Sequence, residues 1–240
     1  YPLRLDFSKF NGKSGEIRLR WKAPHKIEEP IPERFLTPTR YAEVLTVETP
    51  FPPDDRSEGY ARGTSVSKEW DAATTSAAIE VAAKVFEDLN RLSGSRPGKG
   101  DRSQKLRSFC ERFVERALRH RLTDEQKQLY IESQFQKTED EETAVRRVVM
   151  LALKSPRFLY REIGGQNDTF NFASRLSFGL WDCPPDNQLW NGANGNSLDS
   201  RIKISRHAAR MLNDPRAKTK LREFFHYWLK LDHLTDISKD

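Results

Sequence analysis

The sequence predicts a mainly α-helical protein: an array of about seven to nine helices with a small β-hairpin element at the N-terminus. From Lys68 onward, apolar residues recur with the spacing of amphipathic helices. Near the N-terminus they alternate instead with polar residues, as in half-buried strands. Pro- and Gly-rich stretches separate the two patterns, so a small β element should precede the helices.

The β element comes first in the chain. Leu3, Leu5 and Phe7 alternate with polar residues, and the pattern returns around residues 17–21. Residues 11–15 between them supply the Asn and Gly that a turn with positive φ requires. We therefore expect a hairpin over residues 2–22, and two strands alone are only marginally stable.

A connector rich in proline, residues 38–67, follows. Residues 43–47 could form one short strand there, whereas the prolines of residues 49–56 exclude regular structure. A linking helix is expected over residues 68–94, ended by Gly94.

The remaining helices have clear start signals. Apolar residues from Leu106 to Leu118 follow one helical stripe, and residues 123–126 fit a capping box for the next helix. Acidic residues 139–142 favour another helix start, and Pro156 suits the first position of a short helix. Later helices are expected over residues 168–181, 185–192, 199–213 and 215–231, the last with an aromatic face.

Composition narrows the classes of function. The 41 basic and 35 acidic residues give a net charge of +6, with both signs mixed along the predicted helices. This mixing indicates a solvated surface and disfavours a nucleic-acid groove. No run of about 18 apolar residues occurs, so no membrane span is expected.

The cysteines and histidines disfavour a cofactor held by this segment. Covalent haem c attachment uses a Cys-x-x-Cys-His motif, which the chain lacks, since Cys110 and Cys183 lie far apart in sequence. A disulfide between them stays open, although nothing places them within bonding distance. His207, His226 and His233 are isolated, without the spacing of a metal site, and are more often structural residues than ligands.

Four carboxylates and two arginines are the candidate site residues. Asp54 with Asp55, and Asp182 with Asp186, could bind calcium or serve acid–base chemistry. The favoured alternative is a polar turn among prolines in each case, with Asp186 as a helix N-cap. Arg157 and Arg175 could bind an anionic partner, but pairing between helices is the favoured role.

Aromatic residues near these arginines allow two interpretations. They could form a ligand box, but core packing is the better account. They are Phe158, Tyr160, Phe172, Phe178 and Trp181.

Three sequence motifs, called phrases below, resemble those of a known family. They are Ser155-Pro-Arg-Phe-Leu-Tyr-Arg-Glu162, Ala173-Ser-Arg-Leu-Ser-Phe-Gly-Leu-Trp181 and Leu212-Asn-Asp-Pro-Arg-Ala217. Together with residues 109–125 they resemble the helical domains of unknown function in large exported planctomycete proteins associated with cytochrome c. The resemblance implies a small helical domain over 104–163 and the start of a larger one over 168–240 that continues further. Residues 1–37 resemble the last strands of a PA14-like β-sandwich.

The resemblance sets further expectations. It implies an extracytoplasmic location, haem c elsewhere in the parent protein, and other domains of the same polypeptide as partners, with carbohydrate as a further one. It carries over no established activity for the helical domains. The predicted function is therefore a non-catalytic scaffold or interaction segment. The alternative is part of an extracytoplasmic oxidoreductase or polysaccharide-active enzyme whose site is completed outside this segment.

Structural features can separate these functions. A cleft with convergent carboxylates would favour the enzyme. An exposed apolar face would favour a docking scaffold, and a continuous Lys/Arg face would favour nucleic acid, the weakest of the three interpretations.

Overall fold

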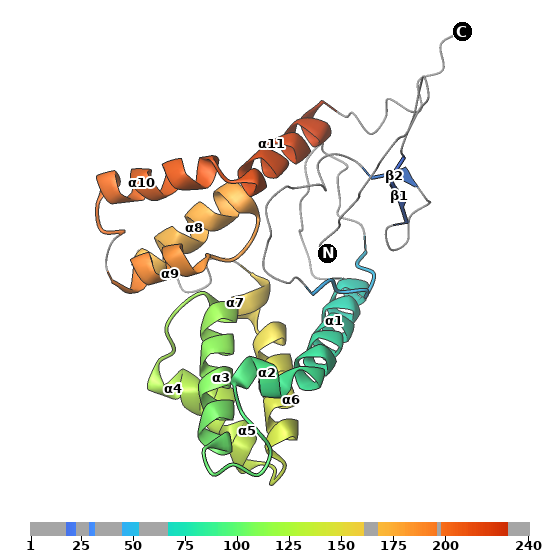
Figure 1. Ribbon diagram of the computed structural model, residues 1–240, viewed down its shortest axis with the longest axis vertical. Helices are drawn as coiled ribbons and strands as arrows, with labels where there is room; N and C mark the ends of the chain where they lie inside the picture. Colours follow the sequence, from blue (N-terminus) through green and yellow to red (C-terminus); the bar gives the residue numbers. More distant parts are fainter. Residues whose placement is uncertain are drawn as a thin grey trace, which may run out of the picture. The chain divides into compact units, whose positions relative to one another are not determined.

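The computed structural model describes residues 18–22, 29–31, 45–52, 67–160, 168–195 and 198–229. It confirms the mainly α-helical class (Figure 1). The chain divides into two compact units, Tyr1–Glu48 and Thr49–Asp240.

The first unit contains two short strands. β1 (Arg20–Trp21) pairs antiparallel with β2 (Glu29–Pro30), and the Ile31 N–H donates to the Leu19 carbonyl over 3.0 Å. Most of the predicted 2–22 hairpin, its residues 2–17, lies outside the described residues. The strand predicted at 43–47 is wrong for residues 45–47, which are irregular, whereas residues 43 and 44 lie outside the described part. Residues 49–52 are irregular as their prolines predict.

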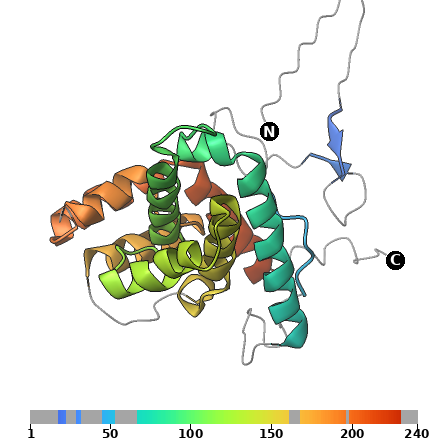
Figure 2. The same ribbon diagram turned by 90° about the horizontal axis from the view of Figure 1, so that it is seen from below.

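The second unit begins with a helical group that spans residues 68–159. Its helices are α1 (Lys68–Glu87), α2 (Leu89–Ser93), α3 (Arg102–Leu118), α4 (Asp124–Lys127), the π-helix η2 (Gln128–Glu132), α5 (Ser133–Gln136), α6 (Glu141–Lys154) and α7 (Pro156–Leu159). α1 packs mainly against α6, as Figures 1 and 2 show, and α3 packs against the same helix. The helix labels exceed the predicted number because the helices expected over 68–94 and from residue 124 are each divided.

A second helical group follows in the same unit. Its helices are α8 (Thr169–Trp181), α9 (Asn187–Asn194), α10 (Arg201–Leu212) and α11 (Pro215–Trp228). Their bounds lie within a few residues of the predicted ones. α8 is the central helix of this group, because it contacts α9, α10 and α11.

The predicted helix starts and stops are confirmed. Thr123 forms the capping box, in which its hydroxyl accepts from the Gln126 N–H and the Gln126 side chain accepts from the Thr123 N–H. Ser155 accepts from the Arg157 N–H at the start of α7, with proline at the first position. Gly94, at φ 65°, ends α2 in the left-handed conformation that glycine adopts without strain.

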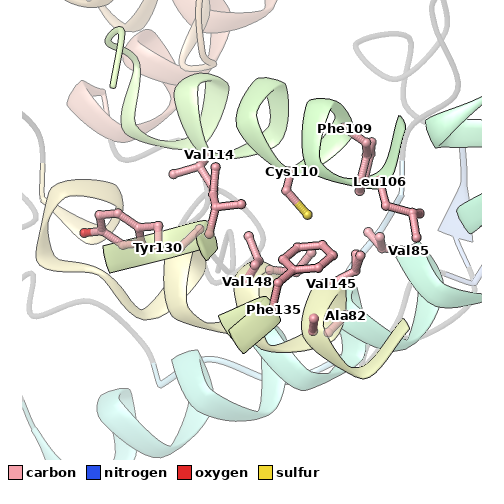
Figure 3. Packing of buried hydrophobic residues seen from close by; sticks show 14 of the residues in the cluster. Ala82, Val85, Leu106, Phe109, Cys110, Val114, Tyr130, Phe135, Val145 and Val148 are labelled. Carbon is pink, nitrogen blue, oxygen red and sulfur yellow. The ribbon is translucent and has the colours of Figure 1, made fainter. Parts of the chain in front are cut away.

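The core of the first group lies between α3, α6, α1 and the η2–α5 segment. The predicted α3 stripe supplies Leu106, Cys110 and Val114, which point toward Val145 and Val148 of α6 (Figure 3). All five are 0 or 1% exposed. Full burial of one such aliphatic side chain stabilises the fold by about 1.5–3 kcal/mol.

The second group has a smaller core around α8. Trp181 is buried, and its indole N–H donates to the Met211 carbonyl over 3.0 Å. Leu189, Leu198 and Met211 are each at most 1% exposed and belong to the same cluster.

Polar contacts link the two helical groups. His120, just after α3, has its Nε2 2.6 Å from an Asp168 oxygen, and its Nδ1 lies 2.8 Å from the Arg121 carbonyl. Arg116 donates to the Asn187 side chain over 2.8 Å and lies over the Trp190 ring. These contacts place the starts of α8 and α9 against the end of α3.

Candidate functional site

An open hollow lies between α9 and α10 in the described part of the chain. Its volume is about 440 Å³. α9 lines it with Gln188, Asn191 and Gly192. α10 contributes the basic residues Lys203, Arg206, His207 and Arg210. Local capping holds both helices in place: Asp186 accepts from the Leu189 N–H at the start of α9, and Ser200 accepts from the Lys203 N–H at the start of α10.

Two of the cations at the hollow already have carboxylate partners. Arg210 donates to both oxygens of Asp186 over 2.8 and 3.2 Å. Lys203 lies 3.0 Å from an Asp199 oxygen. Arg206 is exposed and has no ion pair within the described residues. The hollow therefore keeps an uncompensated positive charge at Arg206.

Two buried nitrogens at the hollow have no hydrogen-bond partner within the described residues: His207 Nδ1 and Arg210 Nε. Burial lowers the pKa of His207, and the positive charges of Arg210 and Arg206 lower it further, against the opposing charge of Asp186. The neutral imidazole is therefore favoured near neutral pH.

The structure separates the predicted carboxylates by role. Asp186 is the N-cap of α9, as predicted, and partial burial alone would raise its pKa. The hydrogen bonds from Arg210 and from the Leu189 N–H outweigh this effect and lower the pKa. Asp182 ends α8 at φ 54° and pairs with Lys220 of α11 over 2.7 Å. Asp182 and Asp186 thus pair with different cations, Lys220 and Arg210, instead of sharing one ligand or proton. Asp54 and Asp55 lie outside the described residues.

The predicted arginines have exposed side chains. Arg157 contacts α3 through its backbone, because its carbonyl accepts from Arg119. Arg175 is exposed on α8. The described residues contain no group of three or more His, Cys, Asp or Glu side chains that could hold a metal ion. His233, one of the histidines considered as metal ligands, lies outside the described residues.

Arg119 is a structural residue that the sequence did not reveal. It is 8% exposed and follows α3 at φ 60°. Its guanidinium donates to the carbonyls of Arg157, Phe158 and Tyr160 over 2.5, 3.2 and 3.3 Å. These carbonyls lie at the C-terminal end of α7, where helices leave acceptors without partners. Spacing gave no signal for this role, since the guanidinium reaches a helix that begins far along the chain.

The five aromatic residues considered as a ligand box play different roles. Trp181 is buried with the Arg216 guanidinium 3.5 Å from its ring centroid. Tyr160 is 40% exposed and contacts the Trp70 ring at 6.0 Å. Phe172 is 39% exposed, whereas Phe158 and Phe178 are half-buried. The predicted role in core packing is therefore confirmed for Trp181 and, in part, for Phe158 and Phe178.

The aromatic face predicted on the last helix is present, and it is exposed. Its members follow helical spacing, and we call them the α11 face: Leu221, Phe224, Phe225, Trp228 and Leu229. The exposed fractions are 56, 55, 39, 66 and 54%. The rings contact one another, with centroids 5.4–6.0 Å apart.

The cysteines are both free. Cys110 lies in the first core (Figure 3), where burial raises the pKa of its thiol to about 12. Cys183 is partly exposed after α8.

Comparison with known families gave two matches. Residues 105–162 match the family model described as PSD5: Protein of unknown function (DUF1595). Residues 168–240 match the one described as PSD4: Protein of unknown function (DUF1592). No curated protein and no solved structure matches the chain. Two consecutive domains of unknown function are therefore confirmed, whereas no match supports the PA14-like resemblance of residues 1–37.

Proposed function

We propose that this chain is a non-catalytic docking segment of a larger exported protein, which holds other domains of the same polypeptide in one assembly. The observation that carries the proposal is the exposed α11 face. Four large apolar side chains of α11, together with Leu229 directly after it, follow one helical face, and each is at least 39% exposed. Contiguous apolar patches of this kind mark interaction surfaces, since single exposed apolar residues are common but clusters are not.

The aromatic content of the α11 face suits docking. Aromatic residues, Trp and Phe among them, are enriched in protein interfaces, and Trp is one of the residues that most often carry the binding energy. Trp228 has the largest exposed fraction of the face, at 66%, and contacts both Phe224 and Phe225. Since the rings already support one another, little side-chain entropy would be lost on binding.

The charges near the α11 face argue against nucleic acid as the partner. Residues 198–229 contain eight Lys and Arg against three Asp and Glu. However, Lys203, Arg210, Arg216 and Lys220 each pair with a carboxylate. The basic residues therefore do not form the continuous unpaired stripe that tracks a phosphate backbone.

The finer parts of the proposal are an extracytoplasmic location, haem c and carbohydrate-binding modules in the parent protein, and those modules as the docked partners. They are supported by the tandem order of the two matched domains and by the resemblance of the three phrases. None of the described helices has both the length and the apolar character needed to cross a membrane. For the enzyme alternative, no specific observation in the described residues adds support.

The test uses the protein expressed from its complete reading frame, with amine cross-linking followed by mass spectrometry. Lys218 is exposed on α11 and gives a reactive amine on the helix that carries the face. We expect cross-links from Lys218 to another domain that Trp228→Ser greatly reduces. Ile202→Ser is the matched control, because Ile202 is 75% exposed on α10, outside the face. Equal cross-linking in both variants would refute docking through α11.

The haem c association is tested on the same preparation. Reduced c-type haem gives sharp visible absorption bands, and the reading frame should encode a Cys-x-x-Cys-His motif. A protein without either would remove the haem-associated part of the proposal and leave the docking part standing.

A further inference from the structure

We propose that the hollow between α9 and α10 binds a small oxyanion, such as a carboxylate, sulfate or phosphate group, through Arg206 together with His207 and the amides of Gln188 and Asn191. This inference rests on the hollow alone and does not depend on docking through α11.

The size and lining of the hollow fit a small polar ligand. Its volume of about 440 Å³ is in the range of small-molecule sites, which run from about 300 to 1,000 Å³. Apart from Gly192, the residues that line it carry polar or basic side chains, which supply the few polar groups that orient a ligand. Side-chain amides and a guanidinium are donors suited to the oxygens of an anion.

The balance of charged side chains at the hollow indicates that the ligand is an anion. Arg210 is compensated by Asp186 and Lys203 by Asp199, but Arg206 has no ion-pair partner in the part of the chain that the structure describes. One positive charge therefore remains for an anion. One uncompensated charge suits a single anionic group, whereas a long polyanion is bound by several unpaired cations, so a small ligand is favoured over a polymer.

Two buried nitrogens beside the hollow are a further indication of a ligand. His207 Nδ1 and Arg210 Nε lack partners among the described residues. Buried polar atoms are nearly always hydrogen-bonded, to protein, water or ligand. Both nitrogens are covered by protein atoms, so they can donate to the acceptor oxygens of an oxyanion only after the side chain of His207 or Arg210 shifts toward it.

Binding would also change the titration of His207. Three charged groups act on this imidazole: Arg210, Arg206 and Asp186. An added negative charge favours the protonated ring, so occupancy should move the His207 titration to higher pH.

The experiment follows the His207 ring signals by NMR in the full chain while inorganic phosphate is added at constant ionic strength. His207→Gln assigns the signals. We expect a saturable shift of the His207 signals, and weaker phosphate binding by about tenfold in Arg206→Gln, the loss of one charge-assisted hydrogen bond. Arg201→Gln is the matched control, since Arg201 is exposed on α10 and does not line the hollow. It should bind phosphate as the unchanged chain does.

Parallel titrations with sulfate and acetate distinguish the type of oxyanion, and the tightest of the three identifies it. Absence of a saturable shift with all three anions would overturn the proposal. So would equal weakening in the two arginine variants, because that result would indicate general charge screening. Both arginines are exposed, so neither variant should disturb folding, and circular dichroism checks this.

Discussion

Replacing Arg119 tests how the Ser155–Tyr160 phrase is held in place. The proposed change is Arg119→Met, which keeps an unbranched apolar stem and removes the guanidinium. The guanidinium donates to three carbonyls at the end of α7 and also to the Ala117 carbonyl over 3.1 Å. The variant leaves those acceptors without their donor, and it also removes a positive charge from a helix C-terminus.

The magnitude follows from the burial of these groups. A hydrogen bond from a charged donor contributes about 1.5–3 kcal/mol, and a neutral one about 0.5–1.5 kcal/mol. Arg157 and Tyr160 are exposed residues, so water can replace part of what their carbonyls lose. The helix-dipole contribution adds about 0.3–1 kcal/mol. We therefore expect a loss of about 2–4 kcal/mol in the free energy of unfolding.

The assays are urea unfolding and thermal unfolding of the full chain, both monitored by circular dichroism. For a domain of this size, a loss of about 2–4 kcal/mol corresponds to a fall in Tm of about 4–16 °C. Arg112→Met is the control, because Arg112 is exposed on α3, the helix that ends just before Arg119, and it should change stability by less than about 0.5 kcal/mol. Hydrogen exchange should be faster at the Tyr160 amide, which bonds to the Pro156 carbonyl. If Arg119→Met is no more destabilising than Arg112→Met, the anchoring role is wrong.

Three further predictions concern other parts of the helical unit. Partial burial alone would raise the pKa of Asp168, but hydrogen bonds from the Asn171 N–H and from His120 outweigh it and lower the pKa. Ionised Asp168 therefore stabilises the fold above its unfolded pKa of about 3.9. This contribution disappears as the pH falls through the lower folded pKa. Asp168→Asn should therefore be destabilising at pH 7, and the difference from the unchanged chain should shrink below about pH 4 in unfolding measurements; a constant difference would contradict this. A thiol reagent at pH 8 should label Cys183 and leave Cys110 unlabelled in the folded protein, because burial raises the Cys110 pKa to about 12; rapid double labelling would contradict the buried placement. Thr123→Ala should lower the free energy of unfolding by about 1 kcal/mol through loss of the capping box, and an unchanged urea midpoint would show that the cap does not contribute.

The sequence predicted the helices well because their signals are local. The stripe from Leu106 to Leu118 and the cap at Thr123 depend on residues within a few positions of one another. The division of a helix at η2 was not predicted, because a π-helical turn has no reliable local signature. The strand expected around Leu45 failed since apolar alternation over five residues cannot show whether a pairing partner exists.

The site was less predictable because it depends on which helices meet. The N-cap role of Asp186 follows from the prolines before it and was predicted, but its pairing with Arg210 depends on how α9 and α10 pack. The roles of Arg119 and Arg206 also could not be read from spacing, since one is buried and the other exposed for reasons of tertiary packing. Exposure of the α11 face was not deducible either, because helical periodicity identifies an apolar face and cannot say what covers it.

The excess of basic residues is used largely inside the fold, and this bears on both proposals. Arg119 serves the carbonyls that end α7, and Lys220 donates to the Phe178 carbonyl near the end of α8 over 2.5 Å. In both places a cation from another segment satisfies acceptors at a helix C-terminus, where the helix dipole also favours positive charge. Arg216 covers the Trp181 ring while it pairs with Asp214. Since these charges are committed to carbonyls, rings and carboxylates, the net charge of +6 is a poor guide to the ligand. Both proposals depend on local surface features and not on the net charge. Docking would use the apolar side chains of the α11 face, and oxyanion binding would use the uncompensated guanidinium of Arg206 at the hollow.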